Sequence, residues 1–297
     1  MPRFAVVADL GGTKIAAARV DDTGRITHTV RAATPSAGGV AVVDAIANLL
    51  GQLPREAACA VGVDVPGLAH PSGVVWAPNI PGWRRMPLAA MLSERLKLPV
   101  VVDSDRNAFV TGEAWLGSAK GCRDVVFLVV GTGIGAGIIS AGGLIRGHGE
   151  LSGCAGWMAV RDRFVRGYEK VGCLEYHAAG PGIARAAQRV FGEPITMREL
   201  VKAARGGDAK AKQVLAAAGH YLGLALANLV DVLNPEMIVI GGGVAGAGNL
   251  LLDPARATLR QWAQPLAVKQ VRIVRSKLGD RAGLLGAARL CFDHIES

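Results

Sequence analysis

Three short glycine-rich segments of this 297-residue chain have the composition that phosphate binding requires. Each follows an apolar run typical of a buried strand, where glycines let several backbone N–H groups converge on an anion without side-chain obstruction. The segments are DLGGTK at 9–14, GTGIGAG at 131–137 and GGGV at 241–244. Their candidate phosphate-binding residues are Asp9, Gly11, Gly12, Thr13, Lys14, Gly131, Thr132, Gly133, Gly135, Gly241, Gly242 and Gly243.

Asp9 ends the first of these strands, where a Mg²⁺ ion or its bound water needs a carboxylate. We therefore expect ATP and Mg²⁺, with the ion near Asp9. Each loop alone is weak support, because glycine-rich turns also end strands for structural reasons.

Two other nucleotide-binding motifs fit the sequence less well. GTGIGA fits the dinucleotide fingerprint, with Glu150 about 20 residues further on, but a strand follows Ala136 where the fingerprint requires a helix. No G-x-x-x-x-G-K-[ST] phosphate loop occurs. Glycine loops in equivalent places of the two halves favour a nucleotide held across a cleft, and hence phosphoryl transfer.

The elements that must position these loops repeat along the chain. Each half opens with strand, glycine loop, strand, turn and strand, and then alternates helices with strands. The first half has strands at 4–9, 14–20, 25–34, 58–64 and 99–103, and helices at 40–53 and 104–117. The second has strands at 124–130, 137–140, 144–145, 237–240 and 270–275, a long helix around 215–233 and a closing helix at 280–295. Such a duplication predicts two α/β lobes that face each other across a cleft.

Composition and charge argue against other classes of protein. Hydrophobic residues make up 51% and charged residues 19%, as in globular chains, and five irregularly spaced cysteines indicate reduced thiols in the cytoplasm. The net charge of +9 is scattered, which indicates a solvated basic surface that favours an anionic substrate over nucleic acid. Residues 125–145 carry no charge, but their six glycines argue against a membrane helix.

Further motifs lie between and after the loops: APNIPGW at 77–83, DSDRNA at 103–108 and GLLGAARL at 283–290. Together with the three glycine loops, in this order, they resemble the ROK family (repressor, open reading frame, kinase) over essentially the whole chain. The resemblance implies an α/β, two-lobed actin-like or hexokinase-like ATPase fold of duplicated ribonuclease-H-like βββαβα units. It also implies a sugar kinase that forms a homodimer or larger homo-oligomer. The family's repressors carry a DNA-binding module ahead of the first loop, and we expect none here.

We expect the N-terminal lobe to span residues 1–118 and the C-terminal lobe residues 119–297. The boundary falls near Gly117–Gly121, where the sequence becomes small and polar. The last helix, about 283–297, is expected to pack back on the N-terminal lobe.

The resemblance places the catalytic base at Asp105, which accepts a proton from the sugar hydroxyl, with the 6-position implied. The structural alternative is that Ser104 and Asp105 only cap the helix that follows. Asn79 and Glu175 match family positions that hydrogen-bond the sugar, although either alone could be a satisfied loop residue. Ser104 stands in the sugar site where the family usually has Asn, which loosens one more contact.

The segment 151–177 departs from the family pattern. The family's Gly-Glu-x-Gly-His aligns with GCAGW, so Cys154 stands at the Glu position and Trp157 at the His position. In the family's zinc motif Cys173 is the one cysteine kept, and one thiolate cannot complete a tetrahedral zinc site. We therefore predict no zinc. In its place we expect an aromatic cluster of Trp157, Phe164 and Tyr168, with Arg166 and Glu169 paired at the surface.

Losing a carboxylate and an imidazole removes two strong hydrogen-bonding groups from the sugar pocket. Plain glucose is therefore a doubtful substrate, and an amino sugar, an N-acyl hexosamine or a cyclitol fits better. The alternative from another functional class is a pseudokinase that binds nucleotide or sugar as a sensor or scaffold.

Overall fold

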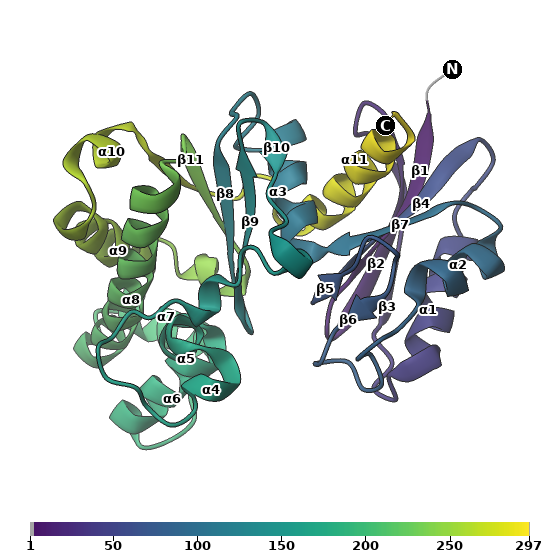
Figure 1. The fold of residues 1–297 in the computed structure, drawn as a ribbon. Helices are drawn as coiled ribbons and strands as arrows, with labels where there is room; N and C mark the ends of the chain where they lie inside the picture. The colour runs from purple at the N-terminus through teal and green to yellow at the C-terminus, as the bar shows by residue number, and fades with distance from the viewer. Residues whose placement is uncertain (1–2, 297) are drawn as a thin grey trace.

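A computed structural model describes residues 3–296, which form two lobes around two five-stranded sheets (Figure 1). In each sheet three antiparallel strands are joined by two further strands that run parallel to the first of them. The N-terminal sheet has the order β3 (Ile26–Ala33), β2 (Lys14–Asp21), β1 (Phe4–Leu10), β4 (Ala58–Val65) and β7 (Val100–Ser104). The C-terminal sheet has the order β10 (Gly143–Leu144), β9 (Ile134–Ser140), β8 (Val125–Val130), β11 (Met237–Gly241) and β12 (Arg272–Arg275). The predicted duplication is confirmed.

Both faces of the N-terminal sheet are covered, which explains why its central strands are almost wholly apolar. Helices α1 (Gly39–Gly51) and α2 (Leu88–Leu96) pack on one face, where Val42 and Leu92 join Val6 in one core cluster. Helix α11 (Ala282–Glu296) packs on the other face, where Leu284 lies in a cluster with Val7. The two-stranded sheet of β5 (Leu68–Ala69) and β6 (Val75–Trp76) extends this lobe.

Helix α3 (Asp105–Leu116) lies between the lobes: it packs on α11, and its Val110 joins Phe127 and Val239 of the C-terminal sheet in a core cluster. The division of the chain between residues 118 and 119 stays a prediction.

The core of the C-terminal lobe forms around α8 (Ala209–Leu233). Gly223 lets α9 (Asn249–Trp262) approach α8 closely, since a Cβ there would lie 2.5 Å from the carbonyl oxygen of Ala255. Helix α8 is long and apolar enough to cross a membrane, but 61% of its most apolar window is buried in this lobe, as in core helices of soluble proteins. The other helices are α4 (Tyr168–Val171), α5 (Cys173–Ala178), α6 (Gly180–Phe191), α7 (Met197–Arg205) and α10 (Pro265–Gln270), with short 3₁₀ turns at His148–Glu150, Ala155–Trp157, Gly243–Ala247 and Gly279–Arg281.

Candidate active site

The first glycine loop forms the tight turn between β1 and β2. The backbone N–H of Gly11 donates to the carbonyl oxygen of Lys14 across the turn (2.9 Å), and the space beside Gly12 is open. The ammonium group of Lys14 lies 2.8 Å from the carboxylate of Asp280, at the start of the last helical segment. The loop therefore presents exposed backbone and a cation toward the C-terminal lobe.

The second glycine loop, residues 131–137, is hydrogen-bonded to segment 151–177, which the family resemblance assigns to the sugar site. The carboxylate of Glu175, on α5, accepts from the backbone N–H of Ile134 (2.7 Å), and burial raises the pKa of this carboxyl group. A Cβ on Gly133 would lie 2.8 Å from the same carboxylate, so a side chain there would push the Glu175 carboxylate aside. Glu175 thus joins the second phosphate loop to the segment 151–177.

The third loop follows β11 and closes a cavity of about 430 Å³ between the lobes. At Gly242, φ is +88° and a Cβ would lie 2.4 Å from the carbonyl oxygen of Val130, so a side chain is excluded. The cavity is lined by Asp9, Lys14, Phe109, Phe127, Val129, Ile240, Gly241, Gly242, Gly243, Ala245, Gly246, Arg275, Ser276, Gly279 and Asp280. Two of the three glycine loops therefore face one cavity, and its bare backbone and cations fit a nucleotide.

Asp9 has a partner that our interpretation of the sequence missed. Asp9 and Asp64 are in register on the parallel strands β1 and β4, and both carboxylates lie close to Gly283 of α11. Asp64 is fully buried, and neither of its oxygens has a donor among the described residues. Burial, together with the neighbouring carboxylate, raises the pKa of Asp64 well above its usual range. A carboxylate pair of this kind fits a divalent cation beside Asp9; a charged residue inside the apolar strand ACAVGVDV was the available signal.

Asp105 begins α3 directly after β7, and the residue that follows it, Arg106, contacts Glu150 and Cys154. Oδ1 of Asp105 accepts from the backbone N–H of Arg106 (2.7 Å), whereas the hydroxyl of Ser104 makes no capping bond and is buried with no hydrogen-bond partner among residues 3–296. Burial raises the pKa of Asp105 to about 6. Such a carboxylate is ionised at neutral pH yet remains basic enough to take a proton, as a general base requires.

The pKa of Asp105 predicts the pH dependence of turnover. Because only the ionised carboxylate accepts a proton, we expect kcat/KM to fall below pH 6, by about tenfold per unit, and to level off above it. The measurement is kcat/KM between pH 5 and pH 8 at saturating Mg-ATP. A flat profile across pH 6 would contradict a base with this pKa.

Two arginines, Arg106 and Arg146, join the segment around Asp105 to the loop that precedes Cys154. The guanidinium of Arg106 donates to the carbonyl oxygen of Glu150 (3.0 Å) and lies 3.6 Å from Sγ of Cys154, so Cys154 lies close to the residue that follows Asp105. Arg146 bridges Asp103 and Glu150 at 2.6 and 3.1 Å. Asp103, in turn, accepts from the side chain of Asn107 (2.8 Å). Nothing in the sequence indicates that the loop before Cys154 is bound to β7 and α3 in this way.

Two sequence-predicted sugar residues lie apart from these contacts. Asn79 is exposed in the turn after β6, and its side chain has no hydrogen bond within residues 3–296. Trp157 is 56% exposed and makes no ring contact there.

The expected aromatic cluster is therefore wrong in part. Phe164 and Tyr168 pack edge to face at 5.6 Å, but Tyr176 and His177 complete the cluster in place of Trp157. The Tyr168 hydroxyl hydrogen-bonds Nε2 of His177, and burial lowers the pKa of that imidazole to about 4. The Arg166–Glu169 pair is also wrong, because Glu169 instead accepts from the backbone N–H of Gly167.

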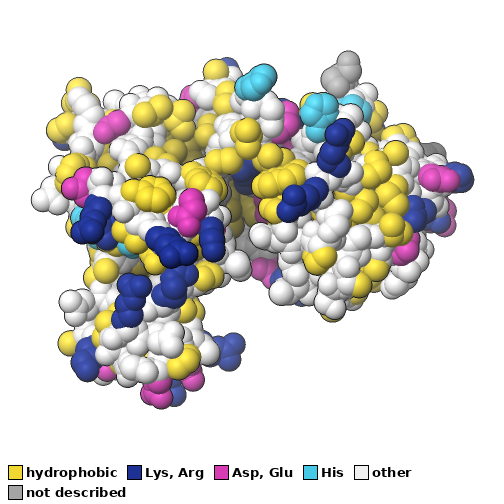
Figure 2. Space-filling view, turned by 60° about the horizontal axis from the view of Figure 1, so that its bottom comes forward, with side chains coloured by type: hydrophobic (Ala, Val, Ile, Leu, Met, Phe, Trp, Pro, Cys, Tyr) yellow, Lys and Arg dark blue, Asp and Glu magenta, His cyan; other side chains and the backbone are white. Residues whose placement is uncertain are grey.

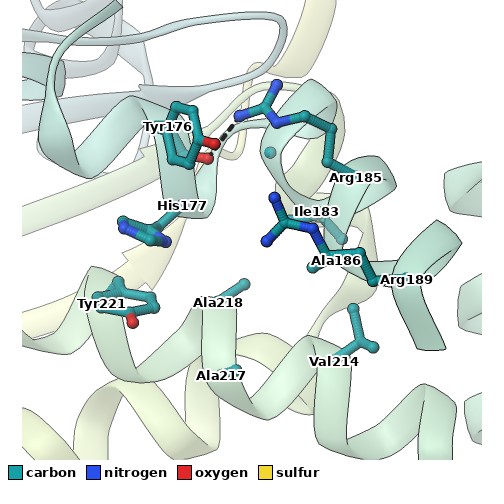
Figure 3. A pocket seen from close by; sticks show the side chains of 11 residues that line it. Tyr176, His177, Ile183, Arg185, Ala186, Arg189, Val214, Ala217, Ala218 and Tyr221 are labelled. Atoms are coloured by element: carbon teal, nitrogen blue, oxygen red, sulfur yellow. Dashed lines mark hydrogen bonds between the residues drawn. The ribbon is translucent and has the colours of Figure 1, made fainter. Parts of the chain in front are cut away.

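Behind this cluster lies a small cavity of about 60 Å³ (Figure 3). There His177 stacks on Tyr221 at 4.2 Å, and Arg185 donates to the carbonyl oxygen of Tyr176 (2.8 Å). The cavity is too small for a sugar ring, so it stands outside the site.

The absence of zinc stays a prediction. Cys173 is the one cysteine of the zinc motif that is kept, and the Tyr168 hydroxyl nearby is hydrogen-bonded to the imidazole of His177. Elemental analysis of protein purified without chelator is expected to give well below one zinc per chain, and EDTA is expected to leave the melting temperature unchanged. Stoichiometric zinc would contradict this.

Comparisons with known proteins identify the family and the fold. The ROK family pattern matches residues 5–294. A glucokinase of Streptomyces coelicolor is 35% identical, with 95% of each chain covered, and an N-acetyl-D-glucosamine kinase of Escherichia coli O6:H1 is 31% identical, with 95% of this chain and 97% of the relative covered. Among solved structures, a ROK hexokinase from Thermus thermophilus has a TM-score of 0.85 at 36% identity, covering 99% of both chains. A Streptomyces griseus ROK glucokinase, solved with glucose and AMPPNP, has a TM-score of 0.82 at 34% identity, covering 98% of this chain and 99% of that one.

The fold and the site define an ATP-dependent sugar kinase with the two-lobed actin-like ATPase fold. Within that class, the chain belongs to the ROK family.

Proposed function

We propose that this kinase transfers the γ-phosphoryl group of Mg-ATP to the 6-hydroxyl of a hexose-like sugar, in the cleft between its two lobes. The observation that carries the proposal is the position of Asp105. It is a basic carboxylate at the start of α3, one residue from a side chain that reaches Cys154. The resemblance puts Cys154 in the sugar site.

Each group has a role that its chemistry supports. The glycine loops hold the phosphates through backbone N–H groups, and Lys14 supplies positive charge at the cleft. Asp9 and Asp64 would hold Mg²⁺, which neutralises charge on the phosphates when bound. Asp105 accepts the proton of the sugar hydroxyl as that oxygen attacks phosphorus, and the bond from phosphorus to the ADP oxygen breaks. Closure of the lobes would exclude water, so that the sugar and not the solvent receives the phosphoryl group.

We further propose an amino sugar or otherwise modified hexose as the preferred acceptor. Cys154 and the exposed Trp157 replace two strong hydrogen-bonding side chains of the family pattern, which weakens the recognition of plain glucose hydroxyls. Because several relatives are glucokinases, glucose is the reference against which this preference is measured. We expect the enzyme to act in the cytoplasm as a homodimer or larger assembly.

The test is ADP release with Mg-ATP across glucose, mannose, glucosamine, 3-amino-3-deoxyglucose, N-acetylglucosamine, N-acetylmannosamine and a cyclitol. A modified sugar with a higher kcat/KM than glucose supports the proposed preference, and a higher value for glucose contradicts it. Nucleotide binding without turnover of any acceptor would instead favour a sensor that binds nucleotide without catalysis.

A further inference from the structure

A second cavity, of about 370 Å³, lies between the lobes on the acceptor side. The N-terminal lobe supplies the segment around β5 and β6 and the residues after the APNIPGW turn, and the C-terminal lobe supplies the loop that precedes Cys154. The space-filling view shows a hollow between the lobes with Lys and Arg side chains on both sides (Figure 2). The cavity is lined by Leu68, His70, Ser72, Val74, Val75, Trp76, Arg84, Arg85, Gly149 and Glu150.

One hydrogen bond and one chain connection place this cavity beside the acceptor site. Glu150, on its C-terminal side, accepts through its carbonyl oxygen from Arg106, the residue that follows Asp105. On its N-terminal side, Arg84 follows directly after the segment that carries Asn79. A substituent on a sugar held near Asp105 and Asn79 can therefore extend into this cavity.

The free charge in the cavity is positive. Arg84 and Arg85 are exposed, and neither forms a hydrogen bond or ion pair within residues 3–296. The carboxylate of Glu150 is already paired with Arg146 (3.1 Å), so it does not compete for these two guanidinium groups. Paired guanidinium groups are well suited to carboxylates and phosphate or sulfate oxygens, which they bind through charge-assisted hydrogen bonds.

The same cavity offers an apolar surface beside the charge. Trp76 is 46% exposed, and the cavity wall next to it includes Leu68 and Val74. An aromatic face of this kind packs against the C–H groups of a sugar ring or of a short alkyl substituent. A ligand that fits both the two arginines and this apolar surface is a sugar with an acidic group attached.

We propose that the acceptor carries an acidic group, a carboxylate or a phosphate or sulfate ester, on the part of the ring away from the 6-hydroxyl, and that this group binds Arg84 and Arg85. The inference rests on the proposed sugar kinase activity and narrows its modified hexoses to acidic ones. The preference is a property of this cavity and not of the phosphate loops, because the nucleotide cavity has a separate lining.

The experiment compares kcat/KM for matched acidic and neutral sugars. The pairs are glucose 1-phosphate with glucose, glucose 3-sulfate with glucose, and N-acetylmuramic acid, which carries a lactic acid ether at O3, with N-acetylglucosamine. We expect at least one acidic sugar to exceed its neutral partner by about tenfold or more, the size expected for a charge-assisted hydrogen bond. The pair that responds also shows whether the group is a carboxylate or an ester.

The variant R84Q/R85Q is expected to remove that preference while leaving kcat/KM for the neutral partner within about threefold, because a neutral sugar has no acidic group for these side chains to bind. Both side chains are exposed, so the variant is expected to fold as wild type. The control R198Q/K202Q makes the same charge change on α7, at exposed positions outside both inter-lobe cavities, and is expected to retain the preference.

Turnover of neutral sugars without preference for any acidic partner would overturn this inference and leave the kinase proposal intact. A preference that survives in R84Q/R85Q would equally overturn it. Failure to phosphorylate any sugar would overturn both proposals together.

Discussion

Replacing Asp105 by asparagine is expected to lower kcat by about 10²–10⁴-fold, the usual contribution of a general base. Asparagine has nearly the same shape, and its amide oxygen can still accept from the backbone N–H of Arg106. What is lost is the ability to take a proton from the sugar hydroxyl. The effect should therefore fall on kcat, with little change in the affinity for nucleotide.

The measurement is steady-state turnover of the best acceptor, together with nucleotide binding by calorimetry and the melting temperature. D162N, at an exposed position with no hydrogen bond among the described residues, is the matched control and should behave as wild type. If D105N retained kcat within a few-fold of wild type, Asp105 would be a helix-capping residue and the base would lie elsewhere.

Replacing Glu113 by alanine is expected to destabilise the protein by about 3 kcal/mol, because it leaves buried donors unsatisfied. Glu113 is fully buried on α3, and its carboxylate accepts from the backbone N–H of Ser118 (2.6 Å), the hydroxyl of Ser276 (2.6 Å) and the backbone N–H of Leu278 (3.0 Å). Residues 117–124 lead from the N-terminal lobe into the C-terminal sheet, and residues 276–281 lead back to α11. One carboxylate thus holds both connections between the lobes.

We expect the melting temperature of E113A to fall by roughly 6 °C, measured by calorimetry. The matched control is E193A, at an exposed loop position, which should change stability by less than about 0.5 kcal/mol. A melting temperature equal to that of wild type would show that other acceptors replace the carboxylate, and that the connections do not depend on it.

Much of the fold was predictable because its signals are local. An apolar strand that runs into several glycines occurs at Phe4–Leu10 and again at Val125–Val130. Each of these patterns can be recognised from about ten consecutive residues. The start of α3 at Asp105 was similarly predictable, since the polar pair Ser104–Asp105 begins a helical pattern. These local signals are the reason why the duplicated fold was predicted correctly.

The site was less predictable because its contacts join distant segments. The sequence does not indicate a role for Asp64, since nothing near it in the chain shows that strand register sets it beside Asp9. The contact of Arg106 with Glu150 spans 44 residues, and that of Glu113 with Leu278 spans 165. In the aromatic cluster, the wrong partner was assigned to Tyr168 because neighbours in the sequence do not fix which rings face each other.

The sequence by itself therefore determined the two-lobed architecture, the glycine loops and the position of Asp105, because strand periodicity, glycine placement and helix starts are encoded by adjacent residues. Only the tertiary structure decided which carboxylates share a buried site, which arginines are paired, and which remain free in the cavity beside Trp76. The physical reason is that hydrogen bonds and ion pairs act over a few ångströms in space. Chain folding alone sets which side chains come within that distance.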